Sequence, residues 1–221
     1  MLRPEPGATA TCDSARELGL DPVAVPLFAI EPVAWEAPEQ SGFDGLLVTS
    51  ANALRQGGPE LKKVRGLPIY AVGEASAAEA RAHGFSLSAT GSGGVDDLLG
   101  SIDADLRLLH LCGEERREPS APRQAITALP VYRASELPTP DVSAIGGAVV
   151  AVHSPRAGAR LAQLAASGGG IDASSVAIAA ISREAARAAA GVVWEDVAIA
   201  DEPSDGALLA LAAAVCNTSQ R

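Results

Sequence analysis

The chain has 221 residues, a formal net charge of −10 and 48% hydrophobic residues. This composition is that of a globular protein, and the acidic balance argues against nucleic acid as a partner, because nucleic acid needs a basic face. No apolar run approaches the roughly 20 residues of a membrane span, and Met1–Glu5 lack the apolar core of a signal peptide, so we expect a cytoplasmic protein.

Short apolar segments rich in strand formers alternate with Ala-rich segments along the chain. Nearly all-apolar runs are typical of strands covered on both faces, whereas Ala favours helix. In chain order, the sequence predicts a helix at 8–18, an extended segment at 23–33, strands at 46–48 and 69–72, a helix at 75–83, a loop at 91–94, a strand at 106–111, a helix at 122–128, an extended segment at 129–134, a strand at 148–152, a helix at 156–166, a strand at 176–181, a helix at 183–190, a strand at 197–199 and a helix at 207–215. Strands alternating with helices predict parallel α/β layers.

Three segments resemble segments found about half the chain length further on. The pairs are 45–50 with 148–154, 69–73 with 177–182, and 94–99 with 204–209. Such a near-constant offset predicts two similar α/β lobes, each too small to hold the whole chain.

The two lobes are not expected to follow one another along the chain. The first copy starts near Gly42, so the residues before it are free to complete the second copy. We therefore predict a discontinuous lobe 1 at 1–30 plus 137–221, lobe 2 at 36–128, and hinge crossings at 26–34 and 129–138. Both crossings are extended and contain Pro, as expected of paired linkers, and two hinged lobes leave an interlobe cleft that suits a small molecule.

Metal and nucleotide motifs are missing from the sequence. There is no phosphate-binding loop, no zinc-protease motif and no serine-hydrolase elbow. The three cysteines, Cys12, Cys112 and Cys216, are far apart and are expected to be buried free thiols. The three histidines lack metal-ligand spacing: His83 is expected at a helix end, His110 as a satisfied core residue, and His153 is less clearly structural. We therefore expect no metal and no cofactor.

Five predicted strands end in a small polar residue or Gly, with a helix expected to follow at once. These ends lie at 49–52, 72–76, 111–114, 153–156 and 181–184. Carboxyl ends of parallel strands face the ligand crevice, and free N–H groups of helix N-termini bind anions. The alternative is that the Ser, Thr and Asn side chains here are ordinary helix caps. Five such ends, with arginines at or near them, favour an anionic ligand; the arginines are Arg3, Arg55, Arg133, Arg156 and Arg183.

Taken together, these segments resemble uroporphyrinogen-III synthases, the cofactor-free cyclases of tetrapyrrole biosynthesis. The resemblance covers nearly the whole chain, in order, through residues 2–6, 43–53, 70–76, 84–85, 109–113, 131–133, 153–156 and 179–182. It implies two parallel-sheet, flavodoxin-like α/β lobes joined by a two-stranded β-ladder, in a monomer.

Three positions depart from the family pattern. The strand that normally precedes Arg3-Pro4 is nearly absent, and Ser182 stands where the family usually has Gly. Ala185 stands where many members have a Thr that faces the cleft, so one polar contact of the family pattern is in question.

The resemblance implies the reaction. Linear hydroxymethylbilane loses its hydroxyl, passes through a spiro intermediate and closes with ring D inverted, giving uroporphyrinogen III. Because bilane also cyclises unaided, without the inversion, the enzyme must mainly bias geometry. Tyr132 is the candidate catalytic residue, with packing at the hinge as its alternative. The candidate substrate contacts are Arg3, Ser50, Asn52, Gly73, Ser76, Gly113, Ser154, Arg156 and Ser182.

Two other classes of function stay open from the sequence. One is a non-catalytic two-lobe binding module for an anionic small molecule, which Ala185 favours. The other is a different two-lobe transferase, which would need a nucleotide or sugar-phosphate site that no Gly-rich loop supports.

Overall fold

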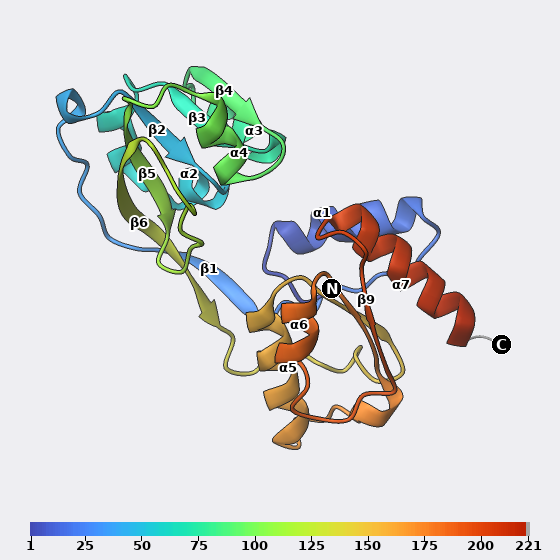
Figure 1. Cartoon of the computed structure of the whole chain (residues 1–221). Helices are drawn as coiled ribbons and strands as arrows, with labels where there is room; N and C mark the ends of the chain where they lie inside the picture. The colour runs from blue at the N-terminus through green and yellow to red at the C-terminus, as the bar shows by residue number, and fades with distance from the viewer. Residues whose placement is uncertain (220–221) are drawn as a thin grey trace. The chain divides into compact units, whose positions relative to one another are not determined.

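The computed structural model describes residues 1–219 and divides the chain into two compact units (Figure 1). Unit 1 consists of Met1–Ala29 together with Glu136–Arg221, and unit 2 of Ile30–Ser135. The fold is mixed α/β with parallel sheets, as the alternation of strands and helices predicts.

Unit 2 is built on a six-stranded sheet in the order β1-β6-β5-β2-β3-β4, in which β1 is the edge strand beside β6. The pairs β6–β5, β5–β2, β2–β3 and β3–β4 are parallel. The strands are β1 (Phe28–Pro32), β2 (Gly45–Val48), β3 (Ile69–Val72), β4 (Leu87–Gly91), β5 (Arg107–Gly113) and β6 (Ala125–Glu136). The helices are η1 (Gln40–Gly42), α2 (Asn52–Gln56), η2 (Gly58–Val64), α3 (Glu74–Ala82) and α4 (Val95–Ser101).

Both faces of this sheet are covered, which explains the continuous apolar runs of its central strands. Along β2, Leu46 and Val48 belong to one core with residues of α2, η2 and α3. Leu47, between them, belongs to a second core with Leu98 and Leu99 of α4. Successive strand residues point to opposite faces, so a strand with helices on both sides must be apolar throughout.

Unit 1 is built on a smaller parallel sheet in the order β7-β8-β9. Its strands are β7 (Val149–Val152), β8 (Ala177–Ala180) and β9 (Asp196–Ile199), and its helices are α1 (Gly7–Glu17), α5 (Pro155–Ala166), η3 (Ala173–Ser175), α6 (Arg183–Ala188) and α7 (Asp205–Ser219). Within this unit, Figure 1 shows α5 beside α6, and α1 beside α7. Ala151 and Ala179 pack against Leu208 and Ala212 of α7. As predicted, no full strand precedes Arg3. The carbonyls of Met1 and Leu2 nevertheless accept hydrogen bonds from the N–H groups of Val25 and Leu27.

The structure differs from the sequence predictions at four places. Residues 122–128 were expected to form a helix, but Ala125–Glu136 is the long strand β6. No helix follows Gly113, because an irregular segment leads from there to β6. The predicted loop at 91–94 covers only residues 92–94, because Gly91 ends strand β4, which the sequence analysis missed. Cys216 is also partly exposed, whereas Cys12 and Cys112 are buried thiols as expected.

Close packing of α5 on α6 depends on Gly158. A Cβ atom at this position would lie 2.6 Å from the carbonyl oxygen of Ala185 and 3.2 Å from the amide nitrogen of Ala189. Both are backbone atoms, so the steric clash of an added Cβ atom can be removed only if the two helices move apart. We expect Gly158→Ala to lower the melting temperature of unit 1 by several degrees, since overpacking costs about 1–3 kcal/mol.

The matched control for this change is Gly206→Ala at the start of α7, where an added Cβ meets nothing within 4 Å. Because Ala is the better helix former, this variant should melt at or above the temperature of the parent chain. Calorimetry measures both melting temperatures. Equal values for the two variants would show that α5 and α6 are not closely packed at Gly158.

Candidate functional site

A cavity of about 520 Å³ opens at the carboxyl edge of the unit 2 sheet. Three neighbouring strands contribute to it where they end: Thr49 and Ser50 follow β2, Val72 ends β3, and Gly113 ends β5. The rest of the wall comes from Tyr132 on β6, from residues 93–97, which lead from a loop into the first turn of α4, and from the loop at 115–117. Of the sequence-predicted site residues, this cavity brings together Ser50, Gly113 and Tyr132.

Tyr132 is held against the cavity wall by the backbone of Gly113. A Cβ atom at position 113 would lie 2.9 Å from Tyr132 Cζ and 3.1 Å from its hydroxyl oxygen. The register of β5 against β6 shifts at this point, and the Glu114 N–H donates to the Tyr132 carbonyl at 2.9 Å. Only a residue without a side chain leaves room for the phenol ring here.

Charges of both signs line this cavity. Asp96, Asp97 and Glu115 bring carboxylates, whereas Arg116 and Arg117 bring guanidinium groups. Hydrogen bonds from the backbone and hydroxyl of Ser120 lower the pKa of Asp96, so this side chain is held as a carboxylate. The sequence analysis missed all five groups, because it looked for donors at helix starts and the basic residues lie in a loop.

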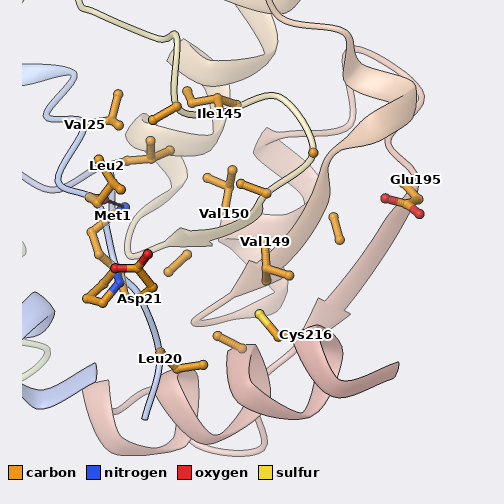
Figure 2. Close-up of a pocket in the computed structure, with 18 residues that line it drawn as sticks. Met1, Leu2, Leu20, Asp21, Val25, Ile145, Val149, Val150, Glu195 and Cys216 are labelled. Carbon is orange, nitrogen blue, oxygen red and sulfur yellow. Dashed lines mark hydrogen bonds between the residues drawn. The ribbon is translucent and has the colours of Figure 1, made fainter. Parts of the chain in front are cut away.

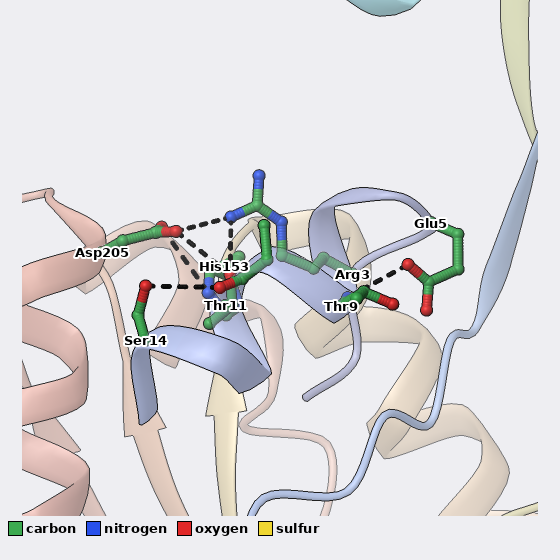
Figure 3. Close-up of polar contacts among 8 residues, drawn as sticks. Arg3, Glu5, Thr9, Thr11, Ser14, His153 and Asp205 are labelled. Carbon is green, nitrogen blue, oxygen red and sulfur yellow. Dashed lines mark hydrogen bonds and ion pairs between the residues drawn. The ribbon is translucent and has the colours of Figure 1, made fainter. Parts of the chain in front are cut away.

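A second group of polar residues lies at the carboxyl edge of the unit 1 sheet (Figure 3). Arg3 donates from Nη1 to Thr11 Oγ1 at 3.1 Å and to Asp205 Oδ2 at 2.7 Å, and the Thr11 hydroxyl donates to the same carboxylate oxygen at 3.1 Å. His153, directly after β7, has Nε2 3.7 Å from Asp205 Oδ1. Burial, and then the charge of Arg3, lower the pKa of His153 to about 4, so its ring is neutral near pH 7.

The two predicted serines of unit 1 are helix caps. Ser154 Oγ accepts from the Ala157 N–H at the start of α5, and Ser182 Oγ accepts from the Ala185 N–H at the start of α6, both at 3.2 Å. Arg156 lies over the ring of Phe28, 4.6 Å from its centroid. Ala185 is fully buried, so its position presents no surface group.

The remaining predicted contacts lie outside the unit 2 cavity. Ser76 is buried within α3, and Gly73 is the N-terminal cap of that helix with φ at +82°. Asn52 donates its N–H to Ser50 Oγ at 3.3 Å, beside the cavity. Arg133 pairs with Glu31 on β1 at 3.1 Å, and Arg55 pairs with Glu79 at 2.7 Å. Several predicted cationic groups therefore already have carboxylate partners.

A third feature is a cavity of about 410 Å³ at the amino ends of β7 and β8 (Figure 2). Its wall is largely aliphatic, including Leu2, Val25, Ile145 and Val150, and it lies at the opposite end of the strands from His153 and Ser154. Its charged side chains, Asp21 and Glu195, are carboxylates, so it does not match the anionic ligand that the strand ends favour.

Residues 1–219 hold no cluster of three or more His, Cys, Asp or Glu side chains placed to bind a metal ion. Over the same range, every helix is too short or too polar to cross a membrane.

Comparison with known proteins identifies the family. The family model described as uroporphyrinogen-III synthase HemD matches residues 10–210. The chain therefore belongs to the uroporphyrinogen-III synthase family, as the sequence resemblance indicated. No curated protein sequence is significantly similar to it.

A solved structure supports the fold. The uroporphyrinogen-III synthetase of Helicobacter pylori is 16% identical, with 87% of this chain and 92% of that chain covered and a TM-score of 0.60. A uroporphyrinogen III synthase structure from Thermus thermophilus is 18% identical over 95% of this chain and 97% of that chain, with a TM-score of 0.40.

Proposed function

We propose a residue-level account of the reaction that this family membership assigns. As a member of the family, whose model matches residues 10–210, the chain is a lyase that cyclises hydroxymethylbilane to uroporphyrinogen III, with loss of water and inversion of ring D. The match does not favour a non-catalytic binding module. We further propose a cytoplasmic monomer without a nucleic-acid partner, in keeping with the net charge of −10.

The substrate is proposed to bind in a cleft between two hinged lobes. The unit boundaries, Ala29/Ile30 and Ser135/Glu136, lie inside the crossings at 26–34 and 129–138, which supports a hinge at these segments. Units tied by two short linkers commonly change orientation. Binding at the carboxyl edges of both sheets would allow each unit to hold part of one extended tetrapyrrole.

The eight carboxylates of the substrate are proposed to be held by backbone N–H groups and hydroxyls at these edges. A capping Ser accepts a hydrogen bond and keeps its own proton, so Ser154 can still donate to a carboxylate of the substrate. The Ser182 hydroxyl is hydrogen-bonded to the Glu184 carboxylate, which a substrate carboxylate would have to replace. The α3 N-terminus, whose cap is Gly73, has no side-chain cap on its amide donors. Arg3 and Arg156 would add positive charge near the unit 1 edge.

Tyr132 is proposed to act on the departing hydroxyl. The phenol donates its proton as the C–O bond breaks, so that water leaves and an azafulvene cation remains. The substituted carbon of the terminal pyrrole attacks this cation to give the spiro intermediate, which fragments and closes again with ring D inverted. The carbon that forms the last bond then loses a proton, which returns to the phenolate. Atoms balance as one substrate giving one product and one water.

The test is the isomer ratio of the product. Purified protein with no added metal or cofactor should convert hydroxymethylbilane mainly to the III isomer, whereas the reaction without protein gives mainly isomer I. Products should be oxidised to porphyrins and separated by chromatography. A ratio equal to that of the protein-free reaction would overturn the assigned activity, and activity lost on adding a chelator would overturn the cofactor-free mechanism.

A further inference from the structure

The centre of the unit 2 sheet holds a buried polar side chain on an otherwise apolar strand. His110 lies on β5 between Leu109 and Leu111 and is 1% exposed. A polar ring in such a place costs free energy unless it is hydrogen-bonded. Its Nε2 lies 3.0 Å from Thr49 Oγ1, and its Nδ1 has no partner among residues 1–219.

The unpaired Nδ1 decides which nitrogen carries the proton. If Nδ1 carried it, a buried N–H donor would be left without an acceptor, and orphaned buried N–H groups are rarer than orphaned acceptors. The favoured tautomer therefore has its proton on Nε2 and donates to Thr49 Oγ1. Burial, and then the charge of Arg116, lower the pKa of His110 to about 4, so the ring stays neutral in the working range.

Such a bond directs the Thr49 hydroxyl. With one of its lone pairs occupied by His110, Thr49 Oγ1 must donate its own proton elsewhere, and the contact with His110 is its one side-chain hydrogen bond within residues 1–219. Thr49 lies on the wall of the 520 Å³ cavity with Arg116, Arg117 and Tyr132. A β-branched side chain has few χ1 choices, so the donor points in a restricted direction.

We propose that Thr49 donates a hydrogen bond to a carboxylate of the substrate in this cavity, and that His110 is the positioning residue that aims it. This inference rests on the proposed function. It assigns roles to two residues that the pattern of helix starts does not indicate. Thr49 would bind substrate through its side-chain hydroxyl, and His110 is buried in the core of unit 2 and would not touch the substrate.

The experiment is a double-mutant cycle on KM for hydroxymethylbilane. Thr49→Val keeps the shape and removes the hydroxyl, and we expect KM to rise roughly tenfold to hundredfold with kcat little changed, because a hydrogen bond to a charged group is lost. His110→Phe should raise KM severalfold. The double variant should match Thr49→Val alone, because His110 acts only through Thr49. Thr49→Ser and His110→Gln, which keep the donors, should restore most of the binding.

Independent effects that multiply in the double variant, or a KM unchanged by His110→Phe, would overturn the positioning role. A second measurement needs no variant and no activity: nitrogen NMR of the His110 ring should find the proton on Nε2 from pH 6 to pH 8, and a proton on Nδ1 would overturn the inference. If the parent chain gives only isomer I, the proposed function fails, while the ring tautomer still reports on Thr49 and His110 separately.

Discussion

Replacing Tyr132 by Phe is expected to slow turnover by ~10²–10⁴-fold while the fold and product binding are retained. General acid–base help is typically of this size, whereas an ordinary neutral hydrogen bond contributes about 0.5–1.5 kcal/mol, or about tenfold at most. The ring should stay in place without its hydroxyl, because it packs against Gly113 in the wall of the unit 2 cavity. Single-turnover rate constants distinguish a loss of general acid catalysis from the loss of one hydrogen bond, and circular dichroism checks that the variant is folded.

Ser154→Ala is the matched control for a positional loss. It removes a cap of α5, worth about 1 kcal/mol, and the proposed donor to a substrate carboxylate, but no proton-transfer step. If Tyr132→Phe lowers turnover no more than Ser154→Ala does, Tyr132 only positions the substrate or packs in the cavity wall. Catalysis then rests on backbone donors and on the reactivity of the bilane itself.

Acid is expected to destabilise both units below about pH 6.5, because each has a neutral buried histidine. The pKa values of His110 in unit 2 and His153 in unit 1 are lowered from 6.5 to about 4, in both cases mainly by burial. Between these values the unfolded chain binds a proton at each histidine that the folded chain does not. The free energy of unfolding should therefore be greatest above pH 6.5 and fall toward pH 4, by up to about 1.4 kcal/mol per pH unit for each histidine.

Denaturant unfolding between pH 7 and pH 4.5 measures this slope. Carboxylates also titrate at the lower end of that range, so the informative quantity is the difference between the parent chain and a His110→Phe/His153→Phe variant. The variant should show the shallower pH dependence. Identical slopes would mean that neither ring is held neutral by the fold.

Sequence patterns predicted the buried parallel strands well because each of those strands is a continuous apolar run. The run Leu46-Leu47-Val48 is apolar on both faces, as a strand between two helix layers must be. Local pattern failed where tertiary pairing decided the outcome. Residues 125–128, Ala-Ile-Thr-Ala, look helical in an Ala-rich chain, yet they pair along β5. The edge strand β4 alternates between partly buried and exposed residues and has too little apolar content to be noticed.

The site was harder to predict than the fold. Ser50 and Gly113 were predicted because strand ends and the family resemblance both mark them, whereas Tyr132 was predicted from the family resemblance. Arg3 was predicted as a substrate contact, but its partners Thr11 and Asp205 were missed, because Asp205 is 202 residues away from Arg3 and the three residues share no local motif. Thr49 was noted only as part of a strand end, since nothing in the sequence shows that His110, which pairs with Leu47 on the neighbouring strand, would reach Thr49 Oγ1.

The way the chain is divided between the units also sets an order of folding. Unit 2 is one unbroken stretch, Ile30–Ser135, whereas unit 1 needs both Met1–Ala29 and the stretch from Glu136 onward. At about 5–20 residues per second, a ribosome takes on the order of ten seconds to complete the chain after residue 135, while an α/β domain of this size folds in milliseconds to seconds. During that interval the nascent chain holds a finished unit 2 and an N-terminal arm whose core residues, such as Leu2 and Leu27, still await the strands and helices that bury them. Binding of chaperones during synthesis is therefore expected to concentrate on that arm.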